Sequence, residues 1–99
     1  MIKVYHNVGF LNTQDTGKFE DPIHLAATVQ TDDLDDAYRL TNNLEKAWPE
    51  NSGVTCHTDR PRSTSMGDLL LVDSVWHVVE IFGFRSLNES EVGQLNIKE

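Results

Sequence analysis

Three arginines have the clearest potential for chemistry in this chain. Arg60 and Arg62 precede a run of hydroxyl residues, and Arg85 follows the apolar segment after that run. Guanidinium groups, hydroxyls and the N–H groups of a turn can together hold a phosphate or a carboxylate. If the apolar segment folds as a hairpin, its paired ends bring the three arginines close together. The sequence therefore predicts an anion site made of Arg60, Arg62, Ser63, Ser65 and Arg85.

The same residues also have a purely structural interpretation. Arg62 could pair internally with Asp68, six residues later, while Ser65 and Gly67 shape the turn that leads into the apolar strand. A charged turn that precedes a buried strand often needs such internal pairing, because buried polar groups require partners. Both interpretations of Arg62 stay open at the level of sequence.

Metal and nucleophile chemistry receive less support. Cys56 and His57 are the one adjacent cysteine–histidine pair, and no C-x-x-C or H-x-x-x-H spacing occurs. A serine, His77 and an aspartate could be imagined as a catalytic trio, but neither a nucleophile elbow, a P-loop nor a dinucleotide fingerprint is present. We expect no metal, no cofactor and no enzymatic activity. The candidate metal ligands are Cys56 and His57, with His77 as a third and either His6 or His24 as a fourth. The candidate catalytic residues are Ser63, Ser65, His77 and either Asp68 or Asp73.

The charge of the chain is strongly acidic. Sixteen Asp and Glu residues against eight Lys and Arg give a net charge of −8 and a pI of about 4.8. Such a field repels nucleic acid, so nucleic acid is an unfavourable partner. The acidity could serve solubility alone, or it could form a face that engages a basic partner or imitates a nucleic acid.

Four aspartates are concentrated within five residues. They could simply cap a helix and match the positive end of its dipole, although they exceed what capping needs. Together with a tryptophan near the hairpin, which would be a good interface anchor, they form our predicted protein-binding residues. This set is Asp32, Asp33, Asp35, Asp36 and Trp76.

Length and composition indicate one domain over residues 1–99, with a tail from 88 to 99 that we expect to be frayed or to form a short last turn. No apolar run approaches the roughly 18 residues that cross a bilayer, and no signal-peptide segment is seen. The single cysteine, Cys56, cannot form an internal disulfide. We expect a cytoplasmic protein.

Apolar periodicity predicts the elements. Strands are expected over residues 2–8, 23–31, 54–57, 69–72 and 75–82, with the last two joined across Asp73 and Ser74 as a hairpin. A three- and four-residue apolar spacing predicts an amphipathic helix from Leu34 to Trp48, ended by Pro49. Residues 9–22 and 50–65 read as loops. The predicted fold class is α+β, a mostly antiparallel sheet of four or five strands with one amphipathic helix packed on one face.

One pattern in the chain resembles a known group of proteins. It consists of Leu40-Thr41-Asn42-Asn43, then Trp48, then the stretch from Arg62 to Asp68, then a hydrophobic hairpin that ends in Phe82-Gly83-Phe84. This order resembles small uncharacterised proteins of actinobacteriophages, especially mycobacteriophages. The pattern can be written TNN…W…RSTS-x-GD. Similar RS-x-S-x-GD segments occur in YodL-like domains of mobile elements. Met66 departs from it, because a β-branched residue is expected there. The resemblance covers residues 24–87 and implies a phage product in a host cytoplasm, but no catalytic residues.

These observations lead to one functional hypothesis and one alternative. We expect a small, acidic, non-enzymatic phage protein that binds a host or phage protein through its acidic helix or the polar loop before the hairpin. Self-association through Trp76 or an open sheet edge belongs to the same class. The alternative is a nucleic-acid or phosphate-ligand module that uses Arg60, Arg62 and Arg85.

Overall fold

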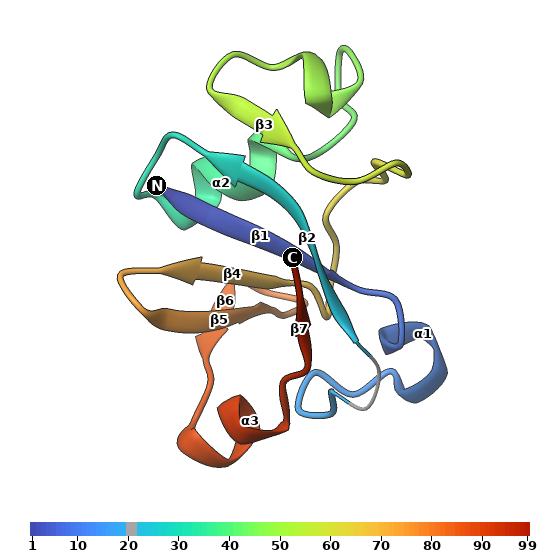
Figure 1. The fold of residues 1–99 in the computed structure, drawn as a ribbon, viewed down its shortest axis with the longest axis vertical. Helices are drawn as coiled ribbons and strands as arrows, with labels where there is room; N and C mark the ends of the chain where they lie inside the picture. Colours follow the sequence, from blue (N-terminus) through green and yellow to red (C-terminus); the bar gives the residue numbers. More distant parts are fainter. Residues whose placement is uncertain (20–21) are drawn as a thin grey trace.

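A central pair of antiparallel strands organises the molecule (Figure 1). The computed structural model describes residues 1–19 and 22–99, which form a seven-stranded sheet in the order β3-β2-β1-β4-β5-β6, with β7 added to β2. All pairs are antiparallel except β2 with β7. The strands are β1 (Ile2–Asn7), β2 (Ile23–Val29), β3 (Val54–Cys56), β4 (Leu69–Val72), β5 (Val75–Val79), β6 (Phe84–Ser86) and β7 (Ile97–Lys98).

Short helical segments complete the described part of the chain. They are α1 (Phe10–Thr13), α2 (Leu34–Leu40), the 3₁₀ turn η1 (Trp48–Glu50) and α3 (Glu89–Gln94). The predicted α+β class is confirmed, with seven strands in place of four or five.

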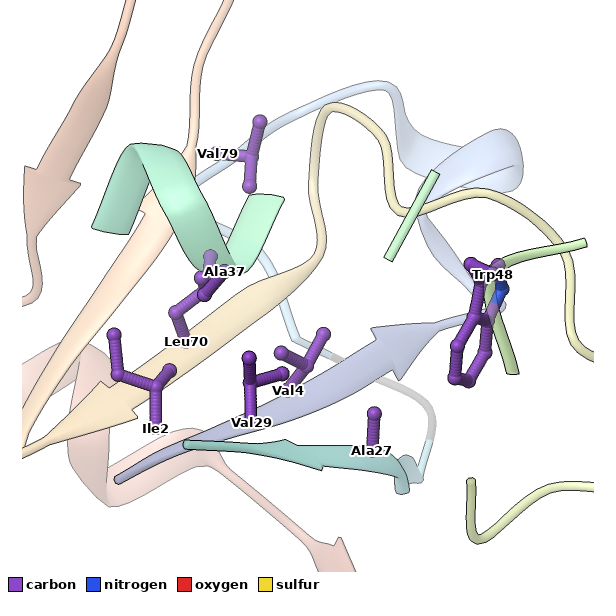
Figure 2. Packing of buried hydrophobic residues seen from close by; sticks show 8 residues of the cluster. All are labelled: Ile2, Val4, Ala27, Val29, Ala37, Trp48, Leu70 and Val79. Carbon is purple, nitrogen blue, oxygen red and sulfur yellow. The ribbon is translucent and has the colours of Figure 1, made fainter. Parts of the chain in front are cut away.

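The sheet is apolar on both faces, because the side chains of each strand alternate between two hydrophobic clusters. One cluster lies beneath α2 and η1, on what we call the α2 face: Ile2, Val4, Ala27, Val29, Ala37, Trp48, Leu70 and Val79 (Figure 2). The other lies on the α3 face: Tyr5, Phe19, Ile23, Leu69 and Val78, with Leu87, Leu95 and Ile97 packed against it. Adjacent residues of β1 and β4 therefore serve opposite cores.

The predicted helix from Leu34 to Trp48 is wrong in length, because α2 ends at Leu40. The Thr41 hydroxyl donates to the carbonyl of Ala37, and the Asn42 amide donates to that of Tyr38. These side chains satisfy the last helix carbonyls, so the backbone can leave the helix without unpaired groups. Trp48 is fully buried, on η1 rather than on the helix.

The chain after residue 88 is not a frayed tail. Asn88 and Glu91 form a reciprocal capping box at the start of α3, and Ile97 of β7 pairs with Ile23. The side chain of Glu99 accepts a hydrogen bond from the Tyr5 hydroxyl at 2.7 Å, which places the end of the chain over β1 (Figure 1).

The predicted hairpin is confirmed, with a shorter second strand. Asp73 and Ser74 both have positive φ angles, 49° and 66°, as the two-residue turn of a twisted hairpin requires. The second strand ends at Val79 rather than at Phe82, and Gly83 (φ 82°) turns the chain back into β6. The predicted loop at residues 9–22 contains α1.

A close approach of the Phe10 side chain requires glycine at position 67. Its φ is 92°, and a Cβ atom there would overlap the side chain of Phe10. Its N–H donates to the carbonyl of Val79, so the position cannot shift without breaking the start of the β4–β5 pair.

We predict that Gly67→Ala lowers the free energy of unfolding by roughly 2–4 kcal/mol, because strain at a positive φ adds to overpacking against Phe10. Gly93→Ala is the matched control, since a Cβ at Gly93, inside α3, meets nothing within 4 Å. The control should be neutral or stabilising by up to about 1 kcal/mol. Urea unfolding measures both, and equal effects of the two substitutions would contradict the prediction.

Candidate functional site

A buried carboxylate lies at the centre of the segment that the sequence singled out. Asp68 is 1% exposed, and its oxygens accept hydrogen bonds from both terminal nitrogens of Arg62, at 2.7 and 2.8 Å. Backbone N–H groups of Asn7 and Ser65 donate to it at 2.8 Å each. The hydrogen bonds to Asp68 raise the pKa of the Arg62 guanidinium above its usual value. The internal interpretation of Arg62 is therefore confirmed.

Backbone contacts connect this ion pair to the rest of the motif. The Trp48 indole N–H donates to the carbonyl of Arg62 at 2.8 Å, and the Asn43 N–H donates to the Ser63 hydroxyl at 2.9 Å. Asn43 in turn accepts from the Trp48 backbone N–H at 3.0 Å. The Thr64 N–H donates to the carbonyl of Thr41 at 2.9 Å. Most residues of the TNN…W…RSTS-x-GD pattern thus contact one another, and together with Asn7 they form what we call the Asp68 network: Asn7, Thr41, Asn43, Trp48 and residues 62–68.

The predicted meeting of three arginines is wrong. Arg85 lies opposite Val78 on the α3 face, whereas the Asp68 network adjoins Trp48 on the α2 face. Arg85 pairs with Glu80 at 2.6 Å and with Glu91 at 2.8 Å. This pairing holds the pKa of Glu91 below its usual range. Arg60 and Arg62 remain near each other, without Arg85.

The four aspartates are arranged around the start of α2. The Asp33 side chain caps the helix by accepting from the Asp36 N–H at 3.2 Å. Asp32 pairs with the terminal amine of Met1, and Asp36 pairs with Arg39. These contacts lie in solvent and each contributes little to stability. Asp35 is exposed, and the structure gives it no ion pair among the described residues.

The predicted anchor Trp76 is half-buried on the α3 face. Its ring packs against Tyr5 with centroids 5.0 Å apart, and it belongs to the cluster around Leu69 and Val78. Much of its apolar area is therefore already used inside the molecule.

A shallow groove lies beside the Asp68 network, where the end of β1 and the start of β2 adjoin residues 58–62. It has a volume of about 420 Å³ and mixes histidine and arginine with apolar side chains. Its lining residues are His6, Val8, His24, Leu25, Ala26, Thr58, Asp59, Arg60 and Arg62. His6 and His24 are direct partners in the β1–β2 register, so they share one face of the sheet.

His6 is the buried member of that pair. Its Nε2 lies 3.0 Å from the Thr64 hydroxyl, and only 5% of the residue is exposed. Burial lowers the pKa of His6 to about 4; the charge of Asp68 opposes this shift and the charge of Arg62 adds to it. The imidazole is therefore neutral at pH 7.

Sequence reasoning missed an apolar tip between β5 and β6. Ile81 is 73% exposed and Phe82 is 95% exposed. The turn is closed by a hydrogen bond from the Glu80 N–H to the Gly83 carbonyl at 3.0 Å. The signal in the sequence is the pair of large apolar residues directly before Gly83, a pattern that also fits the end of a strand.

A small hollow connects this tip to α2. Its lining includes apolar and aromatic side chains together with two carboxylates. The lining residues are Asp35, Tyr38, Val79, Glu80, Ile81, Gly83 and Phe84. Tyr38 packs edge-on against Phe84 with ring centroids 6.1 Å apart, which fixes α2 against β6.

Two kinds of feature are absent from residues 1–19 and 22–99. No three His, Cys, Asp or Glu side chains are grouped as metal ligands there. None of the helices described is long and apolar enough to cross a membrane. Comparison with known proteins found no matching family model, no matching curated protein and no matching solved structure.

We predict that His6 makes the protein less stable in mild acid. In the unfolded chain His6 takes up its proton near pH 6.5, whereas in the folded protein it does so near pH 4. The unfolded state therefore binds more protons between these values, and stability falls as the pH drops through them. The His6 contribution to this loss is about 3 kcal/mol between pH 7 and pH 4.

The measurement is urea unfolding of the parent protein and of His6→Gln across this range. Gln keeps a polar group that can reach Thr64 but does not titrate. The variant should lose distinctly less stability than the parent between pH 7 and pH 4. Parallel pH profiles would show that His6 is not the group responsible.

Proposed function

We propose that this protein is a non-enzymatic binding protein that engages a protein partner through the Ile81–Phe82 tip and the adjacent acidic start of α2. The observation that carries the proposal is the exposure of Phe82, 95%, on a turn that is closed by its own backbone hydrogen bond. Large aromatic side chains are enriched at the centres of protein interfaces and depleted from ordinary surface.

The tip is pre-arranged for contact. The Glu80–Gly83 hydrogen bond and the positive φ of Gly83 hold Phe82 outward, so little ordering is needed on binding. Burying one such side chain contributes about 1.5–3 kcal/mol, and Ile81 beside it adds a second apolar contact.

Charge indicates what kind of partner fits. Asp35 of α2 and Glu80 line the hollow beside the tip. Asp32 and Asp33 are exposed at the start of α2. A complementary surface would offer an apolar pocket for Phe82 with basic groups around it. The net charge of −8 would speed association with such a surface at low salt.

Most of the buried polar side chains support a non-enzymatic role, and the exception among the described residues is His77, whose Nδ1 is buried without a hydrogen-bond partner. Asp68, Glu91, Thr41 and Thr64 all make hydrogen bonds within the fold, and each of these bonds joins one element to another or ends one. The resemblance to actinobacteriophage proteins supports a host protein as the partner and the host cytoplasm as the location.

We predict that Phe82→Ser abolishes partner capture without affecting the fold. A tagged protein incubated with bacterial lysate should retain one or a few proteins, and the variant should retain them at least tenfold less. Leu44→Ser is the matched control, because Leu44 is 69% exposed at a different place, in the segment after α2. It should capture the same proteins as the parent.

Light scattering of the purified protein separates self-association from hetero-association. A dimer that Phe82→Ser dissociates would identify a second copy as the partner. Identical capture by the parent and by Phe82→Ser would contradict the proposal.

A further inference from the structure

We propose that the groove beside the Asp68 network binds a monoanionic carboxylate carried on an apolar body, with Arg62 and Arg60 as the carboxylate ligands. This site lies away from the Ile81–Phe82 tip and does not depend on the function proposed for it. It differs from the anion site predicted from sequence, because Arg85 is absent and apolar residues form much of the groove.

Arg62 has donors to spare. A guanidinium carries five N–H bonds. Nη1 donates to Asp68 and to the carbonyl of Ser63, and Nη2 donates one bond to Asp68. Within the described residues, Nε and the second N–H of Nη2 have no acceptor. These two N–H bonds share one edge of the guanidinium and match the two oxygens of a carboxylate.

The unused edge is held in place. Asp68, which is buried, fixes the guanidinium through two hydrogen bonds, while 41% of the Arg62 side chain remains exposed. A ligand would therefore meet an arginine whose rotamer is already set, which reduces the entropy lost on binding. Arg60 lines the same groove, and no hydrogen bond to a described residue occupies its guanidinium.

The apolar lining selects the rest of the ligand. Val8, Leu25 and Ala26 line the groove, and Val8 is 59% exposed. A second hollow shares Val8 and Arg62 and continues the apolar surface to Leu11 and Met66. An alkyl chain or an amino-acid side chain attached to the carboxylate can lie along this surface, which buries apolar area of both the ligand and the protein.

The local charge favours a single negative charge. Asp68 balances Arg62, and Asp59 lines the groove together with Arg60. The site therefore offers donors without a large excess of positive charge. In a chain of net charge −8, such a site disfavours phosphate dianions and nucleic acid relative to a carboxylate.

The test is an NMR titration of the full chain with octanoate, octanamide and inorganic phosphate. Octanoate should bind saturably and shift the amides of residues 8, 25, 60 and 62. Octanamide and phosphate should each bind at least tenfold more weakly. Equal binding of octanamide and octanoate, tighter binding of phosphate, or no saturable octanoate binding would each overturn the proposal.

A comparison of peptides distinguishes the two kinds of molecule that could carry such a carboxylate, a protein C-terminus and a small amphiphilic acid. A short peptide that ends in leucine with a free carboxylate, compared with its C-terminal amide, tests whether a protein terminus can supply the ligand. A free-carboxylate peptide that binds tighter than octanoate would identify a peptide terminus. Tighter binding of octanoate would identify a small amphiphilic acid.

Substitutions complete the test. Arg60→Gln should weaken octanoate binding about fivefold to tenfold, whereas Arg39→Gln, an exposed arginine on α2, should leave it unchanged. Arg62→Lys keeps a positive charge for Asp68 but removes the Nε–Nη2 edge that would hold the carboxylate. It should therefore weaken octanoate binding more than Arg60→Gln does, in a protein that still folds. If Arg62→Lys unfolds, Arg60→Gln and the shift map still decide the matter. Phe82→Ser should bind octanoate like the parent, which separates this site from the tip.

Discussion

The rest of this structure depends on a carboxylate that is almost completely removed from water. A buried charge without partners is strongly destabilising, so Asp68 requires the donors that surround it. They come from two distant parts of the chain: Asn7 at the end of β1, and Arg62 with Ser65 in the connection that leads into β4. Meeting this one requirement fixes how the connection leaves the α2 face and where β4 begins beside β1.

The segment after α2 is held in place by contacts to the residues that surround Asp68. Trp48 donates its indole N–H to the carbonyl of Arg62 and is fully buried among the residues of the α2 face. Asn43 connects the Ser63 hydroxyl with the Trp48 backbone, so the chain between them has to leave the helical path. Most of the TNN…W…RSTS-x-GD pattern is therefore a set of mutual contacts within the fold. We propose the exposed tip and the groove as the surfaces that recognise a partner and a ligand.

Period-two alternation was sufficient to predict most of the strands, because each strand contributes to at least one buried core. The pairing of Arg62 with Asp68 was one of two interpretations available from sequence, since six residues across a turn can bring such groups together. The helix was overextended because Leu44 and Ala47 continue its apolar spacing. Leu44 is in fact 69% exposed, and a period in the sequence cannot tell an exposed leucine from a buried one.

Other features depended on contacts that are distant in sequence. The pairing of β7 with β2 joins residues more than seventy positions apart, and a two-residue strand has no periodicity of its own. Arg85 was expected beside Arg62, but strand alternation placed it on the α3 face with Glu80 and Glu91. The tip at Phe82 looked like the end of a strand, and only the backbone turn at Gly83 shows that this side chain lies in solvent.

The most direct test of this account is a double-mutant cycle on the ion pair, with Arg62→Gln, Asp68→Asn and the double variant compared by urea unfolding. If the carboxylate and the guanidinium satisfy each other as described, the second substitution will cost much less once the first has been made. The predicted coupling is about 2 kcal/mol or more. Additive effects, within about 0.5 kcal/mol, would contradict the central place of this interaction in the fold.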